Sequence, residues 1–422
     1  MRVTRLRTSV CTAVLLLSSP AAFGANVVSD WNAIMLVTVS DQNPFAQARF
    51  AAITQLAVFE AMNAITGDYT PYLGTIAAPP GASQEAATVA AAHRVLATYF
   101  PGNAASLDAA RVNSLSMIVD GTGKLNGIAV GEAAAMAMIT LRADDGSGTP
   151  MPYTPLSGPG FWQPTPPAFG PAILLHWSKI TPFAILSADQ FRSKPPPALT
   201  NGVYTRDYNE VQEVGDVNST ERPQDRANVA RFFAAASPAQ VWNRVAVQVS
   251  AAHRATLSED ARLFALLNMA IMDSTIAVFD TKYFYQTWRP VTAIWAADTD
   301  GNRRTERDTA FTPFIITPPF PGYPSAHATG SNAAVYVLQR LFGNRRRSIT
   351  LSYPTLPDVI LHYRNFRQIT DDIDDARVYG GIHFRFDQEA GVVQGRDIGA
   401  YIYRHQLRCA SASRCLLEGR DE

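Results

Sequence analysis

The sequence predicts an all-α protein, built as bundles of long helices that are joined by long connections rich in proline and glycine. Apolar residues recur at helical spacing over much of the chain, and several of these stretches are rich in alanine. We find neither an internal repeat nor an alternating run that would predict a strand. With 47% hydrophobic and 17% charged residues, the chain can bury a large core.

The charges balance over the whole chain. Lysine and arginine number 36, aspartate and glutamate also number 36, and the formal net charge is zero. No overall field therefore favours nucleic acid or an anionic membrane. Any preference for an anion must arise locally.

The first 24 residues are predicted to be an export signal. Three arginines precede the short apolar run Val10–Leu17, and Ala22–Gly24 suits cleavage before Ala25. An uncleaved anchor is the alternative, but a spanning helix needs roughly 20 apolar residues. The rest of the sequence offers no other candidate span, so we expect a mature protein that is soluble, in a periplasm or outside the cell.

The cysteines agree with export. Cys11 would leave with the signal, whereas Cys409 and Cys415 lie close together in the predicted C-terminal tail, residues 406–422. A local disulfide is the prediction. A metal site is the alternative, and it would need ligands beyond the neighbouring His405.

Residues 25–254 are predicted to form an N-terminal helical part. Its expected helices are Pro44–Ile65, Gln84–Tyr99, Leu125–Leu141, Val203–Asp216, Arg222–Ala235 and Pro238–His253. Between them, about 142–199, lies a long segment of glycine, proline and aromatic residues. Such a segment usually wraps the surface or covers a site, and we expect it to help wall a pocket.

Residues 255–405 carry the first candidate site residues. Thr256 and Glu259 resemble a capping box that opens a helix towards Lys282. At about 100° per residue, Arg289 would return to the face of Lys282 if the helix continued, although Pro290 stops or turns it. An ammonium and a guanidinium on one face would clamp an oxyanion. The alternative is a lysine that snorkels and an arginine on the surface.

A second candidate lies in Phe320–Val335. Pro324 favours an extended entry, Ser325 is a good N-cap, and the small residues after His327 begin a helix. The free N–H groups of Ala326 and His327 would then face an anion, with His327 beside it as a proton donor. An ordinary capped helix with an incidental histidine is the alternative.

A third candidate begins at Thr370, an expected N-cap followed by a structural run of aspartates. On an ideal helix, four residues share an arc of roughly 120°. These residues are Arg377, Gly380, His383 and Asp387. The glycine would leave space for a bound group, and the carboxylate would fix the histidine tautomer. A surface ion-pair row is the alternative, but it explains neither the glycine nor the histidine.

Together these segments resemble the three-part signature of the vanadium-dependent haloperoxidase and type 2 phosphatidic acid phosphatase superfamily. The matching patterns are Lys-x6-Arg-Pro from Lys282, Pro-Ser-x-His from Pro324, and Arg-x5-His-x3-Asp from Arg377. All three occur in order, and the helical first part is similar to the haloperoxidase-like branch. The resemblance implies a helical bundle of this type and makes 255–405 the catalytic region.

The resemblance also implies roles for the site residues. Cations would neutralise the oxygens of vanadate or phosphate, and they are Lys282, Arg289 and Arg377. Ser325 and the Ala326 amide would add hydrogen bonds. His383 would be the axial group, as the vanadium ligand or as a nucleophile towards phosphorus. His327 would be the acid–base, with Asp387 orienting His383.

Three further positions bear on this resemblance. Ala326 stands where the family usually has glycine, so a backbone angle that needs glycine would be strained. Ala376 stands where a serine commonly precedes the arginine, so one hydroxyl contact is missing. Phe320 resembles the aromatic residue of chloroperoxidase-like members at the predicted halide or substrate pocket, but it does not identify the halide.

The function that the resemblance implies is a vanadate-dependent haloperoxidase. It would use hydrogen peroxide to oxidise halide to a species that halogenates a small organic acceptor. The alternatives are an exported phosphatase that forms a phosphohistidine at His383, which needs no metal, and a helical protein that holds an oxyanion without turnover. The two histidines flanking the anion argue against mere binding, since binding needs only cations and amides.

Overall fold

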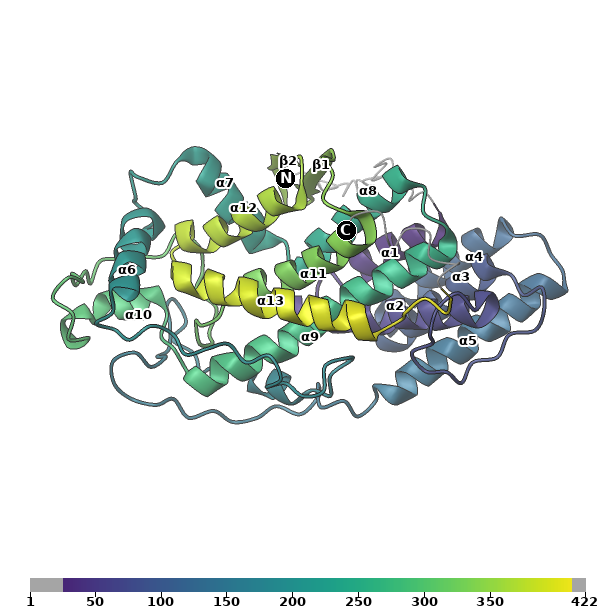
Figure 1. The fold of residues 1–422 in the computed structure, drawn as a ribbon, viewed down its shortest axis with the longest axis horizontal. Coiled ribbons are helices and arrows are strands. Elements are labelled where there is room, and N and C mark those ends of the chain that lie inside the picture. Colours follow the sequence, from purple (N-terminus) through teal and green to yellow (C-terminus); the bar gives the residue numbers. More distant parts are fainter. Residues whose placement is uncertain (1–25, 412–422) are drawn as a thin grey trace, which may run out of the picture.

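The computed structural model describes residues 26–411, and within them helices account for almost all of the regular structure (Figure 1). The predicted signal peptide, Cys11 and Cys415 lie outside the described residues. Cys409 takes part in a disulfide, and its pairing with Cys415 stays a prediction. The α-helices are α1 Val27–Thr38, α2 Pro44–Thr66, α3 Gln84–Tyr99, α4 Ala104–Ser116, α5 Thr122–Leu141, α6 Gly202–Gly215, α7 Gln224–Ala235, α8 Pro238–His253, α9 Leu257–Tyr285, α10 Pro290–Trp295, α11 Ala326–Phe342, α12 Phe366–Tyr379 and α13 Arg385–His405.

Helix α9 runs through the centre of the molecule, α13 lies alongside it, and α1–α5 are grouped at one end (Figure 1). Thr256 caps α9 through the predicted capping box. By length and composition α9 is the one described helix that could cross a membrane, and we did not expect such a helix beyond the signal. However, 94% of its most apolar window is buried in this protein. Its hydrophobicity is therefore that of a core helix.

The helices predicted before residue 255 are all present, with ends within three residues of those expected. The segment between α5 and α6 contains only one short 3-10 helix, Leu175–Lys179, and it runs over the surface. It is fastened to the core by Asp273 of α9, whose carboxylate accepts hydrogen bonds from the backbone N–H groups of Phe183, Ala184 and Ile185. A buried carboxylate thus satisfies three loop donors that would otherwise be unpaired.

Two expectations about the chain after α11 were wrong. A short antiparallel hairpin, β1 Ile349–Tyr353 and β2 Leu356–Tyr363, lies where no strand was expected. Strand β1 alternates over only five residues, and the eight residues of β2 do not alternate between buried and exposed positions, so the period-2 signal is weak. Helix α12 begins at Phe366 with Asn365 as its cap, so Thr370 lies inside the helix and its hydroxyl donates to the Arg367 carbonyl.

The contact between α11 and α13 is unusually close and depends on glycine. Gly391, Gly395 and Gly399 lie one turn apart on α13, and a Cβ at any of them would collide with α11. At Gly395 the added carbon would overlap the Thr329 carbonyl oxygen. Because α11 and α13 begin beside His327 and Asp387, this contact also sets the distance between two parts of the predicted site.

We expect Gly395→Ala to lower the free energy of unfolding by about 1–3 kcal/mol, because the helices must move apart to admit the methyl group. The matched control is Gly202→Ala at the start of α6, where an added Cβ meets nothing within 4 Å. The control should be neutral or slightly stabilising. Urea denaturation followed by circular dichroism measures both, and equal stability of the two variants would contradict the packing argument.

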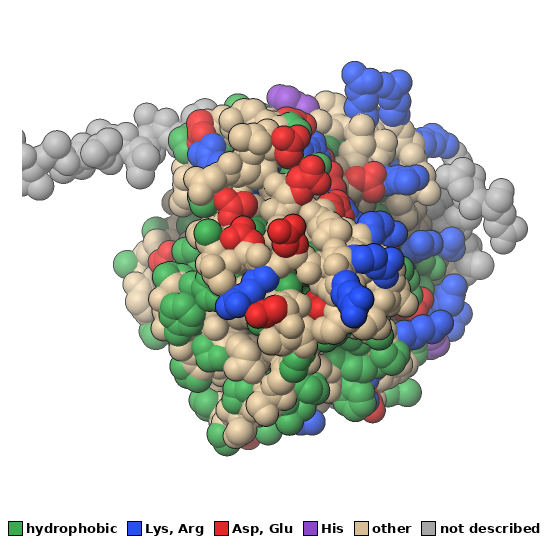
Figure 2. All heavy atoms as spheres, turned by 90° about the vertical axis from the view of Figure 1, so that its left-hand side faces the viewer, with side chains coloured by type: hydrophobic (Ala, Val, Ile, Leu, Met, Phe, Trp, Pro, Cys, Tyr) green, Lys and Arg blue, Asp and Glu red, His purple; other side chains and the backbone are tan. Residues whose placement is uncertain are grey.

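Charges are mixed on the surface. Figure 2 shows the end of the molecule where α6 and α10 lie, with acidic and basic side chains next to each other over its upper half and hydrophobic side chains gathered below them. This mixture fits the zero net charge and the absence of a strong overall field.

Candidate active site

A cavity of about 690 Å³ lies between the end of α7, the middle of α9, the starts of α2, α8 and α11, and the segment before Ser325. Four predicted site residues line its buried end: Arg289, His327, Arg377 and His383. Phe320 and Ala326 also line it, as do Ile173 and Leu174 of the long surface segment. The predicted contribution of that segment to a pocket wall is therefore confirmed.

Lys282 and Arg289 hold the segment that leads into α11. Helix α9 ends at Tyr285 because Gln286 adopts a left-handed conformation, so the two residues do not share one continuous helix face. They nevertheless converge. Lys282 Nζ donates to the carbonyls of Pro321 and Gly322, at 2.9 and 2.6 Å. Arg289 Nε donates to the Phe320 carbonyl at 2.9 Å.

The guanidinium of Arg289 also reaches the third motif. Its Nη1 lies 2.9 Å from both the Ile382 carbonyl oxygen and His383 Nε2. Burial lowers the pKa of Arg289 to about 9, while the Asp387 carboxylate opposes that shift. Burial likewise lowers the pKa of Lys282, and repulsion from the Arg289 guanidinium lowers it further. Positive charge is thus concentrated where little water can reach it.

The site retains unused donors suited to an oxyanion. Arg289 Nη2 and Arg377 Nε are buried and have no hydrogen-bond partner within residues 26–411. Arg377 uses Nη1 to donate to the Phe233 carbonyl, and burial lowers its pKa to about 10. Buried donors normally have partners. A tetrahedral oxyanion such as vanadate or phosphate would satisfy both donors and offset the positive charge, so the residues fit that group.

His383 is held in one orientation and one tautomer. Its Nδ1 lies 2.8 Å from Asp387 Oδ2, and its Nε2 faces the Arg289 guanidinium, which can only donate. The neutral ring therefore carries its proton on Nδ1 and presents the Nε2 lone pair. Asp387 also accepts from the Phe384 N–H at 3.1 Å. The predicted role of Asp387 in orienting His383 agrees with this geometry.

The single helix expected from Thr370 through Asp387 was wrong. Helix α12 ends at Tyr379, Gly381 has φ of +76°, and Asp387 lies in the first turn of α13. Gly380 does not leave space for a ligand, since a Cβ there would lie 2.6 Å from Ile315 Cδ1. The glycine admits a neighbouring side chain, and the turn brings His383 back towards Arg289.

Helix α11 begins as predicted, with Ser325 as its N-cap and His327 in its first turn. Ala326 has no positive φ, so the strain expected there is absent. The Ser325 hydroxyl accepts from the Ala328 N–H at 3.4 Å, and the Ser325 N–H donates to the Asp387 carbonyl at 2.9 Å. A hydrogen bond from Ser325 or Ala326 to an oxyanion stays a prediction.

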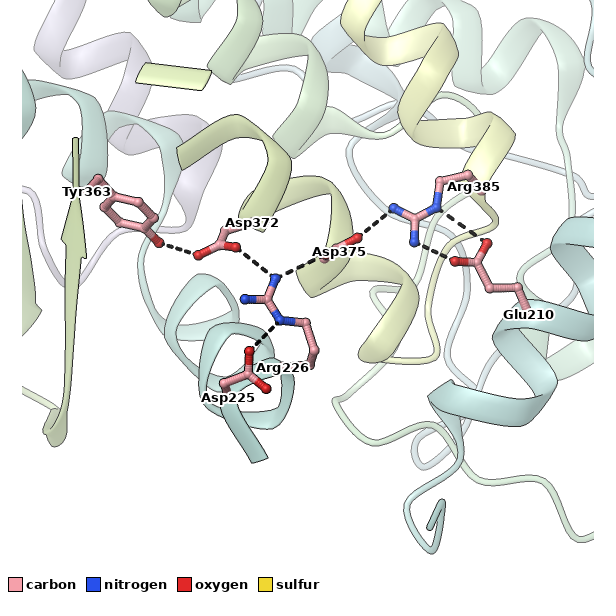
Figure 3. Close-up of polar contacts among 7 residues, drawn as sticks. All are labelled: Glu210, Asp225, Arg226, Tyr363, Asp372, Asp375 and Arg385. Atoms are coloured by element: carbon pink, nitrogen blue, oxygen red, sulfur yellow. Dashed lines mark hydrogen bonds and ion pairs between the residues drawn. The ribbon is translucent and has the colours of Figure 1, made fainter. Parts of the chain in front are cut away.

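An ion-pair chain braces the elements behind the third motif (Figure 3). Arg385, two residues after His383, pairs with Glu210 of α6 and Asp375 of α12. Arg226 of α7 joins Asp375 to Asp372, which accepts from the Tyr363 hydroxyl at 2.8 Å. The aspartate run is therefore structural, as expected.

Sequence reasoning missed a buried carboxylate beside this chain. Asp207 of α6 accepts from the Phe386 N–H at 2.7 Å and fixes the first turn of α13. It also missed the backbone carbonyls of Phe320, Pro321, Gly322 and Ile382 that orient the cations. No residue type marks a carbonyl acceptor, so the sequence carries no signal for those contacts.

Both site histidines are expected to stay neutral in mild acid. Burial lowers the pKa of His383 and of His327 well below 6.5, with repulsion chiefly from Arg289 at His383 and from Arg377 at His327. The folded protein therefore binds fewer protons than the unfolded chain at these rings. Their contribution to stability is present above pH 6.5 and lost as the pH falls through the lower folded values.

Ring-nitrogen NMR of the anion-free protein tests this, with signals assigned by His383→Gln and His327→Gln. We expect both rings to be neutral at pH 6.5 and to titrate below it. Titration of either ring at or above pH 6.5 would contradict the burial argument.

The chain is similar to a domain family, to a curated protein and to solved structures. A family model described as the VCPO second helical-bundle domain matches residues 262–412, which contain all three motifs. The vanadium chloroperoxidase of Curvularia inaequalis is 21% identical over 286 residues, covering 51% of this chain and 46% of that protein. The chain thus spans about half the length of this curated relative.

Two solved structures share the fold over nearly their whole length. The first bacterial vanadium-dependent iodoperoxidase superposes with a TM-score of 0.75 at 26% identity, covering 90% of this chain and 96% of that one. A holo-type bacterial vanadium-dependent chloroperoxidase superposes with a TM-score of 0.72 at 17% identity, covering 87% and 94%. The second likeness shows the fold alone.

Proposed function

Because the chain belongs to the vanadium-dependent haloperoxidase and type 2 phosphatidic acid phosphatase superfamily, we propose that it is an exported vanadate-dependent haloperoxidase. Its substrates would be hydrogen peroxide and a halide, and its product a halogenating species. The observation that carries the proposal is the unused Arg289 and Arg377 donors beside the Nε2 lone pair of His383.

Vanadate, when bound, would supply an electron-poor centre at which peroxide becomes able to transfer an oxygen atom to halide. Lys282, Arg289 and Arg377 would hold its oxygens, and His383 Nε2 would be its protein ligand. The positive electrostatic field would be present before the anion binds, because carbonyl acceptors already fix the Lys282 and Arg289 side chains. Little reorganisation is then needed when the anion binds.

The two histidines would have different roles, His383 as a ligand and His327 as an acid–base. Asp387 keeps the proton of His383 on Nδ1, so Nε2 keeps its lone pair. In this structure that lone pair accepts a hydrogen bond from Arg289 Nη1, and binding of vanadate to Nε2 would have to replace this contact. His327 lines the same cavity, and its lowered pKa makes it neutral at the pH of an ordinary assay. It can therefore accept a proton from hydrogen peroxide and return one to the departing oxygen.

The second candidate is an exported phosphatase, because the same Nε2 lone pair could attack phosphorus and the same cations would hold phosphate. A trigonal-bipyramidal vanadate resembles the transition state of phosphoryl transfer. One pocket can therefore serve either chemistry, and only turnover separates them.

The test uses protein purified without phosphate. Oxidation of iodide, bromide and chloride by hydrogen peroxide is measured with and without orthovanadate, alongside hydrolysis of a phosphate monoester. The proposal expects halide oxidation that requires vanadate and is inhibited by phosphate. Phosphoester hydrolysis that vanadate inhibits, without halide oxidation, would replace the proposal with the phosphatase.

A further inference from the structure

The cavity changes character along its depth. At the buried end lie Arg289, which is 0% exposed, and Arg377 and His383, each 4% exposed. Towards solvent the wall becomes apolar, and the residues there include Ile173 and Ile316, which are 44% and 77% exposed. Single exposed apolar residues are common, but an apolar surface that continues from an exposed rim into a cavity is typical of a ligand-binding groove.

The apolar part of the cavity wall is built from aromatic and aliphatic side chains on separate elements. Phe45 of α2, Phe314 and Phe320 of the segment before α11, and Ile271 of α9 all line it. Phe45 and Phe320 contact each other with ring centroids 5.9 Å apart. A volume of about 690 Å³ exceeds what peroxide and a halide ion require and falls in the range of organic ligand sites.

Charge restricts the ligand further. Among the described residues that line the cavity none is acidic, whereas Arg289 and Arg377 are cationic and Arg231 lies at the wall in an ion pair with Asp358. A positively charged molecule would lose its hydration beside these arginines without gaining a partner. An uncharged aromatic molecule could place its apolar part against the apolar wall and a polar substituent towards the arginines and His383.

We propose that this cavity binds the organic acceptor itself, and that the acceptor is an apolar, electron-rich aromatic molecule without positive charge, such as an alkylphenol. The proposal rests on the proposed haloperoxidase function for its chemistry but not for its binding site. The acceptor would be halogenated inside the cavity rather than by hypohalous acid released into solvent.

The chemistry balances with the substrates already named. Halide loses two electrons to hydrogen peroxide, which takes up a proton and leaves one water and hypohalous acid or its bound equivalent. The phenol ring then attacks the halogen through a carbon beside the hydroxyl group. A carbon–halogen bond forms, the oxygen–halogen bond breaks, and the displaced ring proton leaves with hydroxide as a second water.

The test fills the mouth of the cavity without touching its buried end. Ala235, the exposed last residue of α7, lines the cavity, and Ala235→Trp would place an indole in the opening. The matched control is Val393→Trp, at a 61% exposed position on α13 outside the cavity lining. Calorimetry measures para-butylphenol and tyramine binding without peroxide, and vanadate-dependent bromide oxidation is measured without acceptor.

We expect saturable binding of para-butylphenol, weakened about tenfold or more by Ala235→Trp and unchanged by Val393→Trp, since the indole displaces the butyl chain from apolar contact. Cationic tyramine should bind at least about tenfold more weakly. Bromide oxidation should be similar in all three proteins. Equal phenol binding by both variants, equal affinity for tyramine, or no saturable binding would each overturn the proposal. Failure of bromide oxidation everywhere would remove the proposed function, yet the binding results would still decide the ligand class.

Discussion

Replacing His383 with alanine is expected to reduce vanadate-dependent halide oxidation by more than about 100-fold, to the rate of free vanadate. His383 presents the site's oriented Nε2 lone pair, and loss of outer-shell partners alone commonly costs metal sites about 10- to 100-fold. Steady-state bromide oxidation with saturating orthovanadate measures the effect.

The control for this variant is His362→Ala, at an exposed position of β2 away from the cavity. Removing His383 leaves the buried Asp387 carboxylate without its imidazole partner. Circular dichroism must therefore show retained helix in the variant, and His383→Gln provides a second variant that keeps an amide donor. Wild-type activity in a folded His383→Ala protein would remove the proposed centre.

Arg289→Lys is expected to raise the orthovanadate concentration for half-maximal activity by about 10- to 100-fold. The guanidinium donates to the Phe320 and Ile382 carbonyls, and its Nη2 has no partner among residues 26–411, whereas a lysine cannot make the same forked set of contacts. A hydrogen bond to a charged group contributes about 1.5–3 kcal/mol, and a loss of that size corresponds to the expected 10- to 100-fold change in vanadate affinity.

Arg231→Lys is the matched control for that prediction. Arg231 lines the same cavity but pairs with Asp358 through Nη2 at 2.9 Å, away from the buried end. Its replacement should leave the vanadate requirement within about twofold, because an exposed ion pair contributes little. Equal shifts in the two variants would show that general cavity charge, rather than the Arg289 fork, holds the anion.

The parts of the fold that sequence predicted are those governed by local rules. Thr256 and Ser325 cap α9 and α11 because their side chains accept from backbone N–H groups one turn later. The third motif was predicted on one continuous helix because the spacing of Arg377, His383 and Asp387 suits one. A pattern of period 3.6 cannot reveal that Gly381, with φ of +76°, breaks that helix.

The site residues were predictable as types but not in their contacts. Lys282 and Arg289 were expected to share a helix face, yet they meet because carbonyls of residues 320–322 accept from both. The cavity's apolar wall combines residues as distant as Phe45 and Ile316, and only tertiary packing places them together. Nothing in the sequence distinguishes Asp207 from other acidic residues, because its contact with the Phe386 N–H arises only when α6 packs against α13.

The most direct test of the account is calorimetric titration of the phosphate-free protein with micromolar orthovanadate. The proposed site, in which Lys282, Arg289, Arg377 and His383 would together hold one oxyanion, predicts a single saturable site per chain, competed by phosphate and lost in His383→Ala. Absence of saturable binding, or binding unchanged by phosphate and by that substitution, would contradict it.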